Sequence, residues 1–244
     1  MVSTKHHIHK KKPKRILLKL SWEALMGQQN YWIDVKFLSE LAKKIVYLSK
    51  YKWIELVIVI WWWNIFRWVQ WAAKWLDRAS ADYMGMLATV MNWIALWDAI
   101  EKLGQEVRIM SAIDIPKVAE PFIRRRALKH LKKWRVVICV AWTGNPYFTT
   151  DSAAVLRALE LNCDYMVKGT KVDWVYDKDP IKFKDAKKFD VINVDEALKR
   201  WLRVMDQSAI ALAKDEKLPI FVCKIEDIDK IWSKKINGTL VTTE

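Results

Sequence analysis

Short apolar runs alternate along the chain with longer segments whose apolar residues recur at helical spacing. The runs predict buried strands at Arg15–Leu20, Ile54–Ile60, Val107–Met110, Val136–Val140, Tyr165–Lys168 and Pro219–Cys223. The periodic segments predict helices at Val35–Ser49, Ala81–Leu103, about Val118–Lys132, Ser152–Leu161 and Asp206–Lys214. This alternation predicts an α/β fold in three layers, with a largely parallel central sheet and helices on both faces.

Residues 1–14 differ from the rest of the chain because they are basic and lack an apolar stretch. A secretory signal is therefore not expected, and we interpret the segment as a flexible tail in which His6, His7 and His9 are solvated. No linker interrupts the elements that follow, so residues 15–244 are expected to form a single domain. There is no uncharged apolar run of about eighteen residues, which argues against a membrane span. Three widely spaced cysteines without a CxxC pair favour a cytoplasmic location.

Composition adds two features. The formal net charge of +14 suits a partner that carries phosphates. Glycine numbers only 6, against roughly 17 at an average usage of about 7%, whereas tryptophan numbers 16. Because the tryptophan excess is about as large as the glycine deficit, the composition suggests that one residue has replaced the other.

Three clusters carry candidate chemistry. ILLKLS ends a predicted strand with Lys19 and Ser21, at the edge where α/β sheets bind ligands, although a surface lysine is the alternative. TGNPYFTTDSAAV combines a glycine turn with hydroxyl and carboxylate side chains that open a helix, and free N–H groups at a helix start bind anions. GTKVDWVYDKDP is either a binding loop or a solvated turn, with candidate side chains at Lys171, Asp173, Tyr176 and Asp179.

Six motifs follow one another along the chain: KRILLKLS, IVI followed by NIFR, DYMGMLATVMN, TGNPYFTTDSAA, TKVD followed by VYDKDP, and VMDQSAIALAKDEKLPI. In this order they resemble the bacterial UMP kinases of the amino acid kinase superfamily. The resemblance covers the chain from about Lys14 to Thr239. It implies phosphorylation of UMP to UDP with ATP and Mg²⁺, in a cytoplasmic hexamer with GTP as an allosteric effector. Because Mg²⁺ is expected to arrive with ATP, no side chain is assigned as its direct ligand.

The resemblance also implies roles for individual residues. Lys19 would neutralise charge on the transferred phosphoryl group, Arg67 would approach the phosphates, and Asp151 and Asp206 would orient Lys19 and the metal. The implied ATP site comprises Lys19, Leu20, Ser21, Trp22, Trp63, Arg67, Thr170, Tyr176 and Asp179.

Two further sites follow from the same resemblance. The implied UMP site comprises Trp62, Asp82, Thr143, Gly144, Asn145, Pro146, Tyr147, Phe148, Thr149 and Thr150. The implied GTP-responsive loop comprises Gly27, Gln28, Gln29, Asn30, Tyr31 and Trp32.

The chain departs from the family pattern chiefly at glycines. At nine positions the family pattern has glycine and this chain has tryptophan: Trp22, Trp32, Trp61, Trp62, Trp63, Trp68, Trp134, Trp142 and Trp174. At the position of Trp93 the family usually has a small residue. Several of these positions belong to loops that should cradle phosphates, so impaired activity is expected. A catalytically inactive member of the fold is therefore an alternative. A nucleic-acid binder that uses basic and aromatic residues is another, although the match to one family's glycines argues against it.

Overall fold

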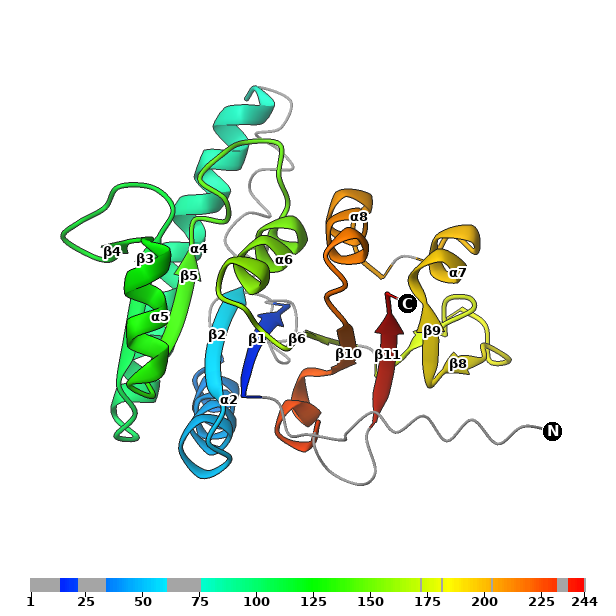
Figure 1. Ribbon diagram of the computed structural model, residues 1–244, viewed down its shortest axis with the longest axis horizontal. Helices are drawn as coiled ribbons and strands as arrows, with labels where there is room; N and C mark the ends of the chain where they lie inside the picture. The colour runs from blue at the N-terminus through cyan, green and yellow to red at the C-terminus, as the bar shows by residue number, and fades with distance from the viewer. Residues whose placement is uncertain are drawn as a thin grey trace.

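The computed structural model describes residues 14–21, 34–60, 76–171, 173–180, 182–202, 204–231 and 237–243. In these residues the main sheet has nine strands in the order β4-β3-β5-β2-β1-β6-β10-β11-β9, which Figure 1 shows from left to right. The strands are β1 Arg15–Leu20, β2 Glu55–Ile60, β3 Val107–Ser111, β4 Glu120–Pro121, β5 Val136–Val140, β6 Tyr165–Thr170, β9 Val191–Asn193, β10 Ile220–Lys224 and β11 Gly238–Thr242. Only the β10–β11 pair of this described sheet is antiparallel. The predicted largely parallel sheet is confirmed.

Two apolar cores cover the two faces of the sheet, because successive strand residues point to opposite sides. Ile16, Leu18 and Leu20 of β1 face a core completed by α2 (Val35–Val46), α4 (Arg78–Glu101) and the 3-10 helix η3 (Ile225–Lys230). Leu17 faces a second core, to which four helices contribute: α5 (Arg124–Lys132), α6 (Thr150–Glu160), α7 (Val194–Lys199) and α8 (Gln207–Asp215). The three predicted layers are therefore present.

Several predicted boundaries are wrong, each for a local reason. The helix expected from about Val118 begins at Arg124, because the segment before it pairs as β4 and contains Pro121, which disfavours a helix at the preceding residue. The helix expected from Ala81 begins at Arg78, since the Asp77 side chain accepts hydrogen bonds from two backbone N–H groups there. The helix expected to reach Ser49 is α-helical to Val46 and continues as the π-helix η1, Tyr47–Tyr51.

The structure also contains elements that were not predicted. β7 (Val175–Tyr176) and β8 (Lys188–Phe189) form a separate antiparallel pair. The short strand β9, α7 and the strand β11 likewise fall in segments without a clear periodic pattern.

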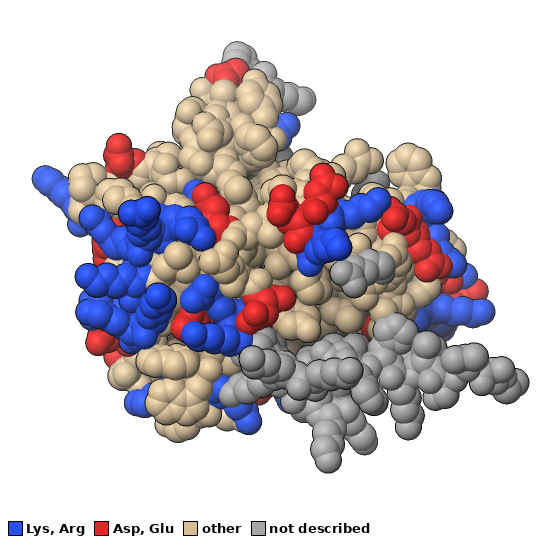
Figure 2. All heavy atoms as spheres, in the orientation of Figure 1, with Lys and Arg blue, Asp and Glu red and all other residues tan. Residues whose placement is uncertain are grey.

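Lys and Arg side chains gather over α5 at the left of Figure 2, where the helix sequence is RRRALKHLK. No helix among the described residues is long and apolar enough to cross a membrane. Apart from Lys14, the predicted tail lies outside the described residues.

Candidate active site

A cavity of about 1060 Å³ opens at the carboxyl ends of β1 and β6. Its wall includes Lys19 from β1, Lys168 from β6 and Asp151 from the first turn of α6. Strands β1 and β6 are parallel neighbours whose register pairs Lys19 directly with Lys168. The carboxyl edge of a parallel sheet is where α/β folds bind ligands, so the predicted position of Lys19 agrees with this general rule.

One carboxylate holds both lysines. Lys19 Nζ lies 3.0 Å from Asp151 Oδ1, and Lys168 Nζ lies 3.0 Å from Asp151 Oδ2. Lys168 also donates a hydrogen bond of 2.6 Å to the carbonyl oxygen of Val204. All three charged side chains are largely buried. The group therefore carries one excess positive charge facing a cavity, which suits an anion.

The environment shifts the pKa values of two of these groups. Burial, followed by the repulsion of Lys19, lowers the pKa of Lys168 to about 8, although Asp151 partly opposes that shift. Burial alone would raise the pKa of Asp151, but the positive charges of Lys19 and Lys168 outweigh it and hold that pKa below its usual value. Asp151 is accordingly ionised at neutral pH.

Asp206 joins the start of α8 to the start of α6. It caps α8 by accepting a hydrogen bond of 2.8 Å from Ala209 N, and it accepts one of 2.6 Å from Ser208 Oγ. It also accepts hydrogen bonds from the hydroxyls of Thr149 and Ser152. Thr149 in turn caps α6. Two helix N-termini, each favourable to negative charge, are thereby fixed at one cavity.

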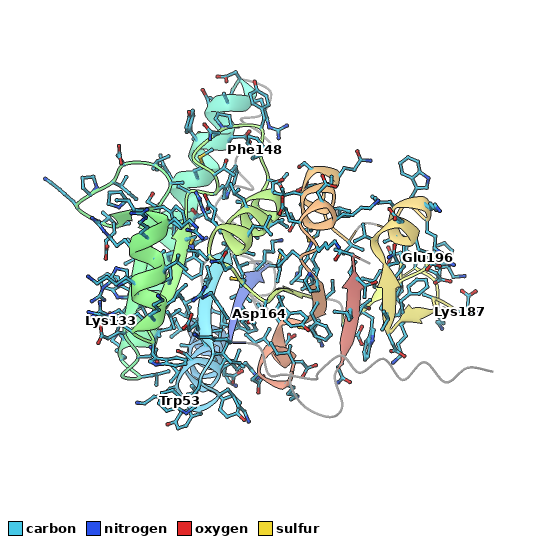
Figure 3. The ribbon with its side chains drawn as sticks, viewed as in Figure 1. Trp53, Lys133, Phe148, Asp164, Lys187 and Glu196 are labelled. Atoms are coloured by element: carbon cyan, nitrogen blue, oxygen red, sulfur yellow. The ribbon has the colours of Figure 1, made fainter. Side chains whose placement is uncertain are left out.

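Asp82 forms a second cluster on α4. Asp82, of which only 8% is exposed, accepts on its carboxylate hydrogen bonds of 3.1 Å from Arg78 Nε and 2.7 Å from Tyr147 N. Arg78 and Asp82 line the cavity together with Phe148, Thr149 and Thr150. Figure 3 labels Phe148, which lies beside α4 and above α6. Asp82 thus ties α4 to the loop before α6.

That loop needs glycine at one position. Gly144 has a φ of 81°, and a Cβ there would lie 2.7 Å from the carbonyl oxygen of Ala112. No other residue fits without moving the backbone. Thr143, Gly144, Asn145, Pro146 and Tyr147 form the turn and are not part of the described cavity wall, unlike the three residues that follow them.

Another part of the wall is formed by the end of β6 and the residues after it. Thr170, Tyr176 and Asp179 line it together with the cationic side chains of Lys171 and Arg200. That the first three contact ATP stays a prediction. The Tyr176 hydroxyl donates a hydrogen bond of 2.9 Å to Asp173. Ser21 also reaches the cavity, whereas the Leu20 side chain is fully buried in the core.

Comparison with known proteins decides what kind of fold surrounds this cavity. Residues 14–224 match the model of the Amino acid kinase family. The chain belongs to the amino acid kinase family. It is 51% identical to the uridylate kinase of Roseobacter denitrificans over 214 residues, which cover 88% of both chains. With the uridylate kinase of Cereibacter sphaeroides it shares 51% identity over 88% of its own length and 87% of that protein.

Solved structures of this kinase family have the same fold. The UMP kinase from Bacillus anthracis superposes with a TM-score of 0.90 at 35% identity, covering 96% of this chain and 98% of that one. The UMP kinase from Ureaplasma parvum gives a TM-score of 0.88 at 33% identity, covering 95% and 100%. The predicted resemblance and the predicted kinase fold are confirmed.

Sequence reasoning missed several cavity residues, among them the cationic Arg78, Lys168 and Arg200. Lys168 had the clearest signal, because it is the one charged residue in the run YMVKGT. Other predicted site residues lie outside the described residues, namely Trp22, Trp62, Trp63, Arg67, Gly27, Gln28, Gln29, Asn30, Tyr31 and Trp32.

Magnesium was expected to accompany ATP. Among the described residues no group of three or more His, Cys, Asp or Glu side chains is placed to hold a metal ion. Mg²⁺ in phosphoryl-transfer sites commonly takes only one or two carboxylates, with the remaining ligands supplied by phosphates and water. Asp151 and Asp206 at the cavity fit that mode of binding.

Proposed function

We propose that the chain transfers the γ-phosphoryl group of ATP to UMP, giving ADP and UDP. The observation that carries the proposal is the buried group of Lys19, Asp151 and Lys168 in the cavity of a family whose members are kinases. A phosphate oxygen of UMP attacks the γ-phosphorus while the bond to the β-phosphate oxygen breaks, and ADP leaves. This reaction requires positioning and charge neutralisation and needs no covalent enzyme intermediate.

The two lysines are suited to stabilising the transferred group. Their ammonium groups point at one carboxylate from adjacent strands, so their positions are fixed before substrate binds. Preorganised charges in a site shielded from water lower a barrier more than mobile ones do. Asp151 orients both lysines, and Mg²⁺ bound with ATP would supply further neutralisation of the phosphate oxygens, near Asp151 and Asp206.

The two nucleotides are assigned to opposite walls of the cavity. Thr170, Tyr176 and Asp179 are proposed to contact ATP, and Asp82 with the segment ending at Thr150 is proposed to contact UMP. Asp82 is rigidly held by Arg78 and by Tyr147 N. A fixed carboxylate is suited to accept hydrogen bonds from ribose hydroxyls. A ligand without those hydroxyls would leave the buried carboxylate without these hydrogen bonds, at a cost in binding free energy.

We also propose that the chain forms a homo-oligomer through α4, a hexamer by the family resemblance, with GTP as an effector and a cytoplasmic location. Tyr83, Met84, Leu87, Met91 and Ile94 lie along one side of α4 and are 41–63% exposed. The opposite side of the same helix is buried in the core. A second copy would remove this apolar stripe from water.

The activity test is an ADP-release assay with ATP, Mg²⁺ and each nucleoside monophosphate in turn, with the Asp151→Asn variant as the control. Release that requires UMP and is lost in the folded variant supports the proposal. Calorimetry on the same sample measures UMP binding. A catalytically inactive member of the fold would bind UMP but release no ADP. A folded sample that binds no UMP would rule out the proposed function, and strong salt-sensitive binding of a labelled oligonucleotide would favour a nucleic-acid binder.

A further inference from the structure

Four tryptophans have a backbone conformation that suits glycine. Trp53, Trp134, Trp142 and Trp201 have φ angles of 53°, 59°, 50° and 55°. Tryptophan supplies four of the eight non-glycine residues with positive φ in the described part of the chain. Side chains with a Cβ are disfavoured in this region, and the residues that tolerate it best after glycine are Asn and Asp. A large aromatic residue is therefore not expected at so many of these positions.

The end of α5 shows what position 134 requires. Trp134 N donates to Leu131 O at 2.9 Å, and Arg135 N donates to His130 O at 3.2 Å. These two hydrogen bonds define a Schellman motif, in which the residue after the helix cap adopts the left-handed conformation and is usually glycine. Trp134 occupies that residue.

The end of α7 repeats the motif. Trp201 N donates to Leu198 O at 3.0 Å, and Leu202 N donates to Ala197 O at 3.0 Å. Trp201 is 83% exposed, so its indole buries little surface in return for the unfavourable backbone. Nothing in the described contacts of this position selects an aromatic side chain.

Three tryptophans line the cavity itself: Trp142, Trp174 and Trp201. Trp142 follows Ala141 in two consecutive left-handed residues after β5, and its side chain is only 5% exposed. Trp174 has a buried indole Nε1 without a hydrogen-bond partner, and so has Trp93 in the core. Buried polar groups in folded proteins are nearly always hydrogen-bonded, so the N–H groups of these two indoles lack a partner that such groups usually have.

We propose that the fold reserves positions 53, 134, 142 and 201 for glycine, and that the polypeptide made in the source cell carries glycine there. The proposal includes a decoding difference, in which a triplet that other cells read as tryptophan is read as glycine in that cell. The composition points the same way, with 6 glycines and 16 tryptophans in 244 residues. The catalytic cavity of that polypeptide lacks the indoles of Trp142 and Trp201 and is correspondingly wider. The backbone geometry at these four positions favours glycine whichever substrate the cavity binds.

Mass spectrometry of the protein from its source cells tests the decoding directly. Trypsin should release a peptide from Val136 to Arg157, in which Trp142 is the one tryptophan. We expect its mass to be lower than that of the same peptide from a recombinant chain carrying tryptophan, by the difference between a tryptophan and a glycine residue. Equal masses would overturn the proposal.

A comparison of glycine with alanine at two exposed positions tests the conformational preference. At position 201 we expect the folded-to-unfolded ratio of Trp201→Gly to exceed that of Trp201→Ala by about fivefold to thirtyfold. At Lys129, an exposed position within α5, the order should reverse by about fivefold, because glycine weakens a helix interior. The same order at both positions would show that position 201 has no preference for glycine.

Discussion

The shifted pKa of Lys168 predicts a pH dependence that can be measured in the free enzyme. Burial and the neighbouring Lys19 lower this pKa to about 8, so the ammonium form falls to about one-tenth near pH 9. If the charged form is needed for phosphoryl transfer, kcat/KM for ATP should fall about tenfold for each pH unit above 8, since kcat/KM reports groups of the free enzyme. The ADP-release assay, with the coupling enzymes in excess at every pH, measures this fall.

The Lys168→Arg variant is the matched control, because a guanidinium stays charged throughout this range. Its activity will be lower at pH 7, but its kcat/KM should not show the fall above pH 8. A flat wild-type profile to pH 9.5, or the same fall in both proteins, would refute the assignment of the charge to Lys168.

The same pKa has a consequence for stability with a defined sign. Between about pH 8 and 10.5, the ordinary pKa of a lysine, Lys168 binds fewer protons in the folded than in the unfolded state. The free energy of unfolding therefore rises with pH across that window. Urea titrations at pH 8 and pH 10 should show this rise in the wild type relative to Lys168→Met, whereas a rise of equal size in both would contradict it.

Three further predictions concern other parts of the molecule. Asp82→Asn should weaken UMP binding by about tenfold or more, because a charged acceptor is lost; calorimetry measures this, and unchanged affinity would remove Asp82 from the UMP site. Leu87→Lys with Met91→Lys should convert an oligomer into smaller species in sedimentation, whereas an unaffected assembly would place the interface elsewhere. Glycine at 22 and at 61–63 should raise turnover, by about 10²-fold if the indoles displace the phosphates by about 1 Å; equal rates would show that these indoles do not obstruct the phosphates.

The central strands could be predicted from sequence because burial on both faces leaves a continuous β-branched run. β2 reads ELVIVI and β5 reads VVICV, and every residue in each is buried. β11 gave no such signal, because its position depends on antiparallel pairing with β10. A Cβ at Gly238 would lie 2.4 Å from the carbonyl oxygen of Val222, and only the folded structure reveals that close approach.

The candidate site was predicted in part for a similar reason. Asp151 stands in a motif that can be read locally, in the first turn of a helix, whereas Asp206 was assigned a role through the family resemblance and proves to be a helix cap. Lys168 could not be assigned a role in this way, because its importance comes from the register that places it beside Lys19. Sequence separation conceals such a pair, and neither residue's neighbours indicate the other.

That pairing also sets the order in which a new chain can become active. β1 can pair with β2 soon after it leaves the ribosome, but its other edge must wait for β6, which begins at Tyr165. At roughly 5–20 residues per second, the interval between synthesis of Lys19 and of Lys168 is about 7–30 s. For most of that interval the first lysine lacks its carboxylate, because Asp151 is synthesised only shortly before Lys168, and throughout it lacks its partner lysine. The charged group that faces the cavity is therefore assembled only in chains whose synthesis has passed β6.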